Sequence, residues 1–460
     1  MAVKSLELIF KGSPMTATFA GKKEVKQGVV YRWSDFVFPF SHKGWDYLFN
    51  NLTKSCYRLD GEELNTDKSA RFSSDDMLTD DNKRVLCEQF YLVPEDKDEA
   101  KFYEGILRLA RALKRDGKGY TRYTILPTTA CNARCVYCFE QGVHYETMKR
   151  ETVEQLIKFI LKTHNPQKEI KLVWFGGEPL VGERIIDRVC TALNENGVKF
   201  HSTMVSNGSL VNESIIQKMS GLWNLRSIQI TLDGVEDEYN FRKNYYHDYP
   251  SAYWHVLGRL KMLNGLERLH INIRVNVDEK NIDGVRQMFA DLDPFLPHKE
   301  RVTVTFALLF NEQASVDEKS LWVWDKCFEM YDELEAAGYL VVTHAGVNVT
   351  KTNFCMADNP ATSVTVTPDG SISNCEHIGA FPPLGNIWDG VTNKELYQSL
   401  MAVENVRDKC RGCLFLPDCT TFSRCPNIKA DCKYARKAQL LHALKQKLDG
   451  IQNESEDEIC

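Results

Sequence analysis

One stretch of sequence, CNARCVYC at residues 131–138, carries Cys131, Cys135 and Cys138 in a C-x3-C-x2-C spacing. It directly follows a short apolar stretch, residues 123–127, whose composition is typical of a β-strand. Three thiolates at this pitch can each hold one iron of an iron–sulfur cube and leave the fourth iron open. An open iron can bind and reduce a small molecule, so the stretch predicts redox chemistry at the end of a strand.

A structural zinc site is the alternative interpretation of the same cysteines. Such sites close with four ligands, usually as two C-x2-C pairs. This stretch holds one such pair, and the nearest further candidate ligand, His144, lies six residues past Cys138. The spacing therefore favours an iron–sulfur cluster over zinc.

The run of three cysteines, with Tyr137 before the last of them, resembles the signature of radical S-adenosylmethionine (SAM) enzymes. The resemblance implies a [4Fe-4S] cluster on Cys131, Cys135 and Cys138, with Tyr137 at the SAM site and SAM bound to the open iron. It also implies reductive cleavage of SAM to methionine and a 5′-deoxyadenosyl radical that abstracts hydrogen from a substrate. Because the motif is short, the ~200 residues after it must also supply a matching barrel.

The overall composition excludes several classes of protein. The chain has 460 residues, of which 43% are hydrophobic and 26% charged, as in ordinary globular proteins with two or three domains. Its formal net charge of −6 gives no general attraction to nucleic acid or to anionic membranes. No apolar run approaches the ~20 residues of a membrane span, and the N-terminus lacks the apolar core of a signal peptide. We therefore expect a cytoplasmic protein that binds neither nucleic acid nor membrane.

The fifteen cysteines are many for a cytosolic enzyme, and they concentrate at residues 131–138 and 355–432. Secreted disulfide-rich domains are instead small and carry cysteines throughout. The distribution therefore indicates metal or cluster ligation in a reducing compartment.

Residues 120–315 alternate strand-like and helix-like segments. The expected strands are 122–126, 170–175, 200–206, 227–232, 269–277 and 302–309, and the expected helices are 147–162, 182–195, 212–219, 251–263 and 283–289. Six βα units with right-handed crossovers predict an α/β fold, a parallel sheet that curls into a partial (β/α)6 barrel of the TIM type. In such barrels the chemistry lies at the C-terminal ends of the strands, where the first strand delivers the three cysteines.

Other strands of this barrel carry residues typical of a ligand site. They are Gly176, Gly177 and Glu178 after the second strand, Ser206 and Asn207 after the third, and Arg274 within the fifth. Two consecutive glycines let a backbone approach a ligand closely, and an embedded arginine can hold a carboxylate with two hydrogen bonds. By resemblance to radical SAM enzymes, the Gly-Gly-Glu stretch contacts the SAM amino group and the serine meets the ribose or carboxylate. Each feature alone could be a tight turn or a buried ion pair, but their order along the strands predicts a SAM site.

Residues 1–115 read as a separate module. Strand-like stretches at 6–10, 29–32 and 36–40 precede helical patterns at 44–53 and 81–89, an apolar stretch at 90–93 and an amphipathic segment at 102–114. Strands followed by short helices predict a winged-helix-like domain. The order resembles the RiPP recognition element, which binds the leader of a ribosomally made precursor peptide as an added strand. A structural cap on the barrel is the alternative.

The C-terminal part of the chain reads as three further regions. Residues 316–349 form a bridging region with a helix at 317–337 and an apolar strand at 339–343. Residues 350–435 hold seven cysteines and a predicted hairpin at 364–372 that turns at Pro-Asp-Gly. Residues 436–460 hold most of a helix expected at 433–448 and a polar, acidic tail expected to be disordered from residue 450.

The cysteine spacing of residues 350–435 closely resembles the SPASM domain, which carries auxiliary [4Fe-4S] clusters in SAM-dependent peptide-modifying enzymes. The resemblance implies a proximal cluster on Cys355, Cys375 and Cys425 and a distal cluster on Cys410, Cys413, Cys419 and Cys432. The loop between Cys419 and Cys425 is longer than the family's C-x3-C, and no second cysteine shortly precedes Cys355. The proximal cluster would then keep an open iron. A zinc site closed by four thiolates within residues 410–432 is the alternative.

These features predict a SAM-dependent maturase of a ribosomally made precursor peptide. It would use three [4Fe-4S] clusters, SAM and an external electron donor such as flavodoxin or ferredoxin. An open iron on the proximal cluster suits a substrate thiolate, which favours thioether crosslinks between cysteine sulfur and carbon. Glu376 follows the second SPASM cysteine, where several family members place a catalytic base; a solvated hairpin residue is the alternative.

Three other functions remain open from the sequence. A carbon–carbon crosslinking maturase would have the same domains but needs no substrate cysteine. An anaerobic sulfatase-maturing dehydrogenase is disfavoured because that family usually lacks an N-terminal module of this length. A non-catalytic cluster-binding protein would form no deoxyadenosine from SAM.

Overall fold

The computed structural model describes most of the chain. The described residues are 5–11, 24–60, 66–113, 118–247, 249–309, 321–341, 360–379, 381–402, 406–418 and 433–457. The chain forms two compact units: a sheet unit, Arg115–Val342 with Cys355–Ala402, and a terminal unit, Met1–Lys114 with Thr343–Phe354 and Val403–Cys460. Within the described residues, no helix is both long and apolar enough to cross a membrane.

The sheet unit is built on six parallel strands, which confirm the six predicted from the sequence. They are β8 (Arg122–Ile125), β9 (Ile170–Trp174), β10 (Phe200–Ser206), β11 (Leu225–Thr231), β12 (His270–Val277) and β13 (Val302–Leu308). They lie in the sheet in their sequence order, each parallel to the next. Alternate residues of β12, such as Ile271 and Ile273, are fully buried, which explains the alternating pattern of that strand.

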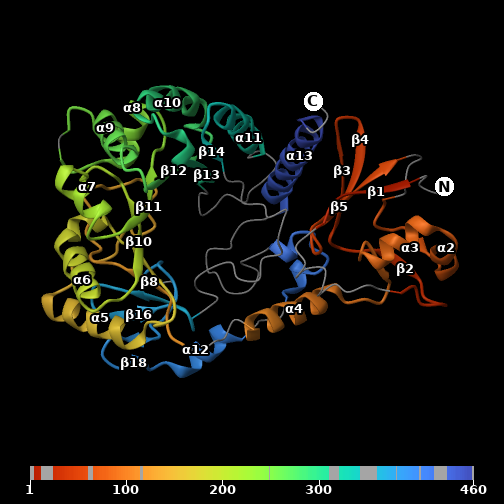
Figure 1. Ribbon diagram of the computed structural model, residues 1–460, viewed down its shortest axis with the longest axis horizontal. Helices are drawn as coiled ribbons and strands as arrows, with labels where there is room; N and C mark the ends of the chain where they lie inside the picture. Colours follow the sequence, from red (N-terminus) through yellow and green to blue (C-terminus); the bar gives the residue numbers. More distant parts are fainter. Residues whose placement is uncertain are drawn as a thin grey trace. The chain divides into compact units, whose positions relative to one another are not determined.

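Helices cover the outer side of this sheet (Figure 1). The predicted ones are α5 (Arg150–Thr163), α6 (Glu183–Glu195), α7 (Glu213–Ser220), α9 (Ala252–Asn264) and α10 (Val285–Leu292), with α8 (Glu236–Lys243) in addition. The sequence of α8, EDEYNFRK, is mostly polar and lacks the apolar stripe by which an amphipathic helix is predicted. The sequence analysis therefore missed α8. This helix supports the loop of the three cysteines.

The sheet continues beyond the six strands at both edges. At one edge α11 (Leu321–Ala336) precedes β14 (Leu340–Val341), which pairs with β13. At the other edge β15 (Ser363–Val366) lies parallel to β8 and is followed by β16 (Ser371–Ser373), β17 (Gly385–Asn386) and β18 (Gly390–Val391). Strands β15 and β16 confirm the predicted hairpin. The place of β15 beside β8 was not predicted. The next strand of the sheet is β16, and Cys375 comes two residues after its end.

The terminal unit contains two antiparallel sheets and short helices. One sheet has the order β1 (Ser5–Phe10), β5 (Ser55–Asp60), β4 (Trp45–Asn50) and β3 (Val37–His42). The other has the order β6 (Arg71–Phe72), β2 (Tyr31–Trp33) and β7 (Leu92–Pro94). The helices are α2 (Ser74–Thr79), α3 (Asp81–Glu88) and α4 (Glu99–Leu113).

The helix predicted at residues 44–53 is wrong, because strand β4 occupies this segment. Lys43 and Gly44 both have positive φ, 48° and 80°, and form the two-residue turn that pairs β3 with β4. In β4, Tyr47 packs into one hydrophobic cluster and Leu48 into another. Because both faces of the strand are buried, the two-residue alternation that identifies a strand is absent from the sequence.

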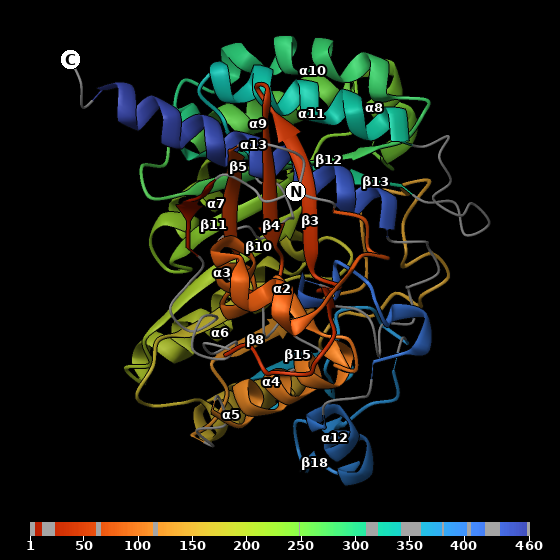
Figure 2. The same cartoon turned by 90° about the vertical axis from the view of Figure 1, so that its right-hand side faces the viewer.

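The long helix α13 (Lys433–Asp457) belongs to the terminal unit and runs across the four-stranded sheet β1-β5-β4-β3 of that unit (Figure 2). The contact consists of Leu440, Ala443, Leu444 and Leu448 against Phe38, Phe40, Tyr47 and Phe49. The helix continues beyond Leu448 into the acidic segment that the sequence suggested was disordered. Once a helix has formed, each added residue gains one hydrogen bond, which offsets the conformational entropy lost on its ordering.

Residues 406–418 pack on α4 within the same unit. The Tyr103 hydroxyl donates to the Pro417 carbonyl at 3.2 Å, and the Val406 amide donates to a Glu104 carboxylate oxygen at 2.6 Å. Cys410 and Cys413 lie partly buried against this core. Residues 350–435, expected as one domain, are thus shared between the two units, with Cys375 in the sheet unit and Cys410 in the terminal unit.

Candidate functional site

A cavity of about 400 Å³ opens in the sheet unit at the C-terminal ends of β8 to β11. The predicted site residues in its wall are Cys131, Cys135, Cys138, Tyr137, Gly176, Gly177, Ser206 and Asn207. These come from three separate segments of the chain, each at or after the end of a strand. The three cysteines are unpaired and partly exposed.

All three thiols lie in the wall of this one cavity, as a cluster held by three cysteines requires. Within the described residues, no three His, Cys, Asp or Glu side chains converge closely enough to hold one metal ion. Burial raises the pKa of the Cys131 thiol to about 12, so a metal must displace its proton on binding.

The two glycines allow the loops after β8 and β9 to touch. A Cβ on Gly176 would lie 2.4 Å from the Thr128 carbonyl oxygen, and one on Gly177 would lie 2.4 Å from that of Ala130. The Gly177 amide donates to the Thr128 carbonyl at 3.2 Å, and the Glu178 amide donates to that of Ala130 at 3.0 Å. This close approach fixes the backbone immediately before the first cysteine.

The Glu178 carboxylate is fully buried and does not line the cavity. It accepts hydrogen bonds from the Ser206 hydroxyl at 2.9 Å, the Asn207 amide at 2.8 Å and the Leu180 amide at 3.0 Å. The side chain therefore positions Ser206 and Asn207. Its backbone carbonyl accepts a hydrogen bond from the Val181 amide at 3.0 Å.

Glu178 gives a prediction on stability and pH. Burial raises its pKa to about 7, against the opposing effect of its hydrogen bonds. Because the folded-state pKa lies above that of the unfolded chain, the free energy of unfolding falls as pH rises through this interval. At about 1.36 kcal/mol per unit, urea unfolding of the protein should show a loss of about 2–3 kcal/mol between pH 5 and 8 that Glu178→Gln lacks. Parallel pH profiles of the two proteins would contradict this assignment.

Arg274 and Glu376 lie outside the cavity wall. Arg274 on β12 donates from Nε to the Asn276 side-chain oxygen at 3.0 Å, and burial lowers its pKa despite the nearby Asp233 and Tyr137. Glu376 is half-buried, and its Oε2 has no hydrogen-bond partner among the described residues. The roles of both residues stay predictions.

The end of the hairpin strand β16 lies beside the cysteine loop. The His377 ring packs on the Phe139 ring with centroids 4.3 Å apart, so Cys375 is close in space to the segment after Cys138. Cys355, Cys419, Cys425 and Cys432 lie outside the described residues. The ligand sets of both auxiliary clusters stay predictions.

The sequence analysis missed a buried triad next to the cavity. The Lys243 ammonium lies 2.9 Å from an Asp233 carboxylate oxygen and donates to the Tyr137 hydroxyl at 2.8 Å. The Tyr137 hydroxyl in turn donates to Asp233. A lysine on a polar helix is normally exposed, so no feature of the sequence distinguished Lys243.

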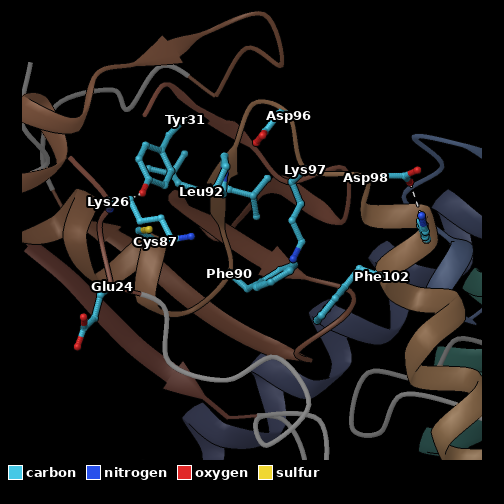
Figure 3. Close-up of a pocket in the computed structure, with 13 residues that line it drawn as sticks. Glu24, Lys26, Tyr31, Cys87, Phe90, Leu92, Asp96, Lys97, Asp98 and Phe102 are labelled. Atoms are coloured by element: carbon cyan, nitrogen blue, oxygen red, sulfur yellow. Dashed lines mark hydrogen bonds between the residues drawn. The ribbon is translucent and has the colours of Figure 1, made fainter. Parts of the chain in front are cut away.

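A second cavity, of about 520 Å³, lies in the terminal unit between β7, α3 and the start of α4 (Figure 3). Its walls include Tyr31, Leu92 and the stacked rings of Phe90 and Phe102, whose centroids are 5.2 Å apart. The Lys97 ammonium lies 4.1 Å from the centre of the Phe102 ring. Charged side chains also line it: Glu24, Lys26, Asp96, Asp98 and Lys101. An apolar floor with a charged rim suits an amphipathic ligand.

Comparison with known proteins identifies one domain of the chain. The family model described as Radical SAM superfamily matches residues 125–291. An uncharacterized protein of Methanocaldococcus jannaschii is 29% identical over 111 residues, which are 24% of this chain and 37% of that protein. The radical SAM cyclopropyl synthase TigE of Paramaledivibacter caminithermalis is 25% identical over 199 residues, 39% of this chain and 42% of TigE. The chain thus spans about two fifths of the length of these relatives.

The fold also resembles a solved structure, native anSMEcpe with bound AdoMet. The alignment covers 72% of this chain and 99% of that one, with a TM-score of 0.56 and 18% identity. The matched family segment includes the three cysteines, the glycine pair, Ser206 and Asn207. The chain therefore contains a domain of the Radical SAM superfamily.

Proposed function

We propose that this protein is a radical SAM maturase that installs thioether crosslinks in a ribosomally synthesised precursor peptide. The observation that carries the proposal is the cavity in which Cys131, Cys135 and Cys138 meet Gly177 and Ser206. A cytoplasmic location, where thiols stay reduced, and an external electron donor such as flavodoxin or ferredoxin belong to the same proposal.

The chain's own residues would hold the cofactors as follows. Cys131, Cys135 and Cys138 would hold a [4Fe-4S] cluster, and the backbone at Gly176 and Gly177 would face SAM. When bound, the cluster and SAM would supply a 5′-deoxyadenosyl radical that abstracts a carbon-bound hydrogen from the substrate. The Ser206 hydroxyl and Asn207 amide, fixed by Glu178, would orient SAM, and Arg274 is a candidate for its carboxylate.

The proposed linkage depends on the auxiliary cysteines. With Cys375 near the cysteine loop and no second cysteine shortly before Cys355, a proximal cluster with an open iron could bind a substrate thiolate. Mass spectrometry of precursor and enzyme should then show a loss of two hydrogens per bridge, with one precursor thiol masked each time. A product that keeps all its thiols would exclude the thioether.

Glu376 is the proposed base that accepts a proton from the substrate. Its buried Oε2, which has no partner among the described residues, supports this role. Glu376→Gln should lower crosslink formation at least ~100-fold, the usual contribution of general base catalysis. Deoxyadenosine formation should change little, because the cysteine loop is untouched. Full crosslinking activity of the variant would remove Glu376 from the mechanism.

The proposed site for the peptide leader is the cavity of the terminal unit. Among the described residues, its neighbour β7 is an edge strand that pairs with β2 on one side only, which leaves a backbone edge for an added strand. Replacing Phe102 by alanine removes part of the apolar wall, and loss of a buried aromatic contact should weaken binding about tenfold or more. Leu109→Ala, an exposed position on the same helix α4, is the matched control. Equal affinity of both variants for a labelled precursor would contradict this site.

A carbon–carbon crosslinking maturase is the second candidate. The 25% identity to TigE supports it, because a cyclopropyl synthase by its name forms a carbon ring. The same mass measurement separates the two linkages, since carbon–carbon bonds remove two hydrogens and leave every precursor thiol free. An anaerobic sulfatase-maturing dehydrogenase would instead act on a sulfatase peptide and form no crosslink.

A further inference from the structure

Lys243 is a buried cation in the wall of the cysteine cavity. Its side chain is 3% exposed, and its ammonium contacts the Asp233 carboxylate and the Tyr137 hydroxyl. Burial opposes the positive charge, but Asp233 and the neighbouring tyrosines and Cys135 hold the pKa of Lys243 well above its usual value. The side chain therefore stays charged.

The backbone around Lys243 supports the loop that carries the cysteines. The Arg134 amide donates to the Lys243 carbonyl and the Val136 amide to the Arg242 carbonyl, both at 3.0 Å. Further along, the Tyr246 amide donates to the Asn132 carbonyl at 3.0 Å. The main-chain carbonyls at the end of α8 thus hold the cysteine loop, and the Lys243 side chain holds Tyr137.

The positive and the negative member of the Lys243–Asp233 ion pair lie at different distances from the cavity. Lys243 lines the cavity, whereas Asp233 is fully buried behind it and is absent from its wall. The positive end of the pair therefore faces the cysteines.

We propose that Lys243 is a positioning residue whose fixed charge favours the reduced state of a cluster held by Cys131, Cys135 and Cys138. In that reduction one electron enters from a low-potential one-electron reductant, and no bond forms or breaks. Each added electron makes the cluster more negative, so a nearby cation stabilises the product. This inference rests on the proposed function, because it requires a cluster at these cysteines.

The test is an anaerobic redox titration followed by electron paramagnetic resonance. Lys243→Gln should lower the equilibrium constant for reduction tenfold or more, a shift of about 59 mV to lower potential per tenfold. Lys243→Arg keeps the charge and should stay within threefold of the unmodified protein. The matched control is Lys218→Gln, which should not move the potential. Lys218 lies on the outer helix α7 and pairs with Glu183 and Asp187 of helix α6.

A second variant covers the case in which Lys243→Gln does not fold. Asp233→Asn removes the negative member of the pair and should move the potential in the opposite direction. A Lys243→Gln protein with full iron content and an unchanged potential would overturn the inference, as would an unchanged potential in Asp233→Asn. Absence of iron from the unmodified protein would instead contradict the proposed function itself.

Discussion

Replacement of Cys135 by alanine should abolish iron binding at the cavity and lower 5′-deoxyadenosine formation at least ~100-fold. Even the outer partners of metal ligands contribute 10–100-fold to affinity or activity, so loss of a ligand itself must cost more. Two remaining thiols cannot hold three corners of a cube. The measurement is iron and sulfide content after anaerobic reconstitution, together with deoxyadenosine released from SAM.

The matched control for this variant is Cys190→Ala. Cys190 is a fully buried thiol of α6 outside the cavity, and burial raises its pKa above the usual range. Its removal leaves a small packing defect but all three cavity cysteines. Because the proposed auxiliary clusters would also contribute iron, the comparison should be made in a Cys375→Ala, Cys410→Ala background. Equal iron content of the Cys135 and Cys190 variants there would contradict the assignment of the cavity.

Replacement of Gly177 by alanine should lower deoxyadenosine formation by about a hundredfold. The added methyl would lie 2.4 Å from the Ala130 carbonyl oxygen and 2.5 Å from that of Thr129, so one of the two loops must move. A misplacement of ~1 Å at a reacting centre can cost about a hundredfold in rate. Since Gly177 does not have a positive φ, the effect tests steric contact rather than backbone strain.

Gly258→Ala in helix α9 is the control for this experiment. A Cβ there meets nothing within 4 Å, and alanine is favoured over glycine in a helix. This variant should keep its activity and gain slightly in thermal stability. If Gly177→Ala retained both iron and the normal rate, close contact of the two loops would not be needed for the site.

The central sheet and the cavity could be predicted because their sequence signals are local. Each parallel strand is a short apolar run followed directly by its polar site residues, and parallel strands place their ends at one edge. Gly176, Gly177, Ser206 and Asn207 therefore met the cysteines as expected from their order alone. The position of Glu178 behind the cavity could not be predicted in this way, because it depends on hydrogen bonds to residues distant in the sequence.

Other features depend on contacts between distant segments and were missed for that reason. Strand β4 is buried on both faces, so its sequence lacks alternation. Helix α8 has a polar sequence without an apolar stripe, and its last residue, Lys243, is directed inward to Asp233 rather than to solvent. The packing of residues 406–418 on α4 joins segments some three hundred positions apart, and no local pattern reports such a contact.

The most direct test of the proposed chemistry is the release of 5′-deoxyadenosine from SAM by the anaerobically reconstituted, reduced protein. The three cysteines, with the loops that Gly177 and Glu178 hold around them, are expected to support this cleavage, giving deoxyadenosine and methionine in equal amounts. A folded protein with its iron in place that leaves SAM intact under reducing conditions would contradict the account.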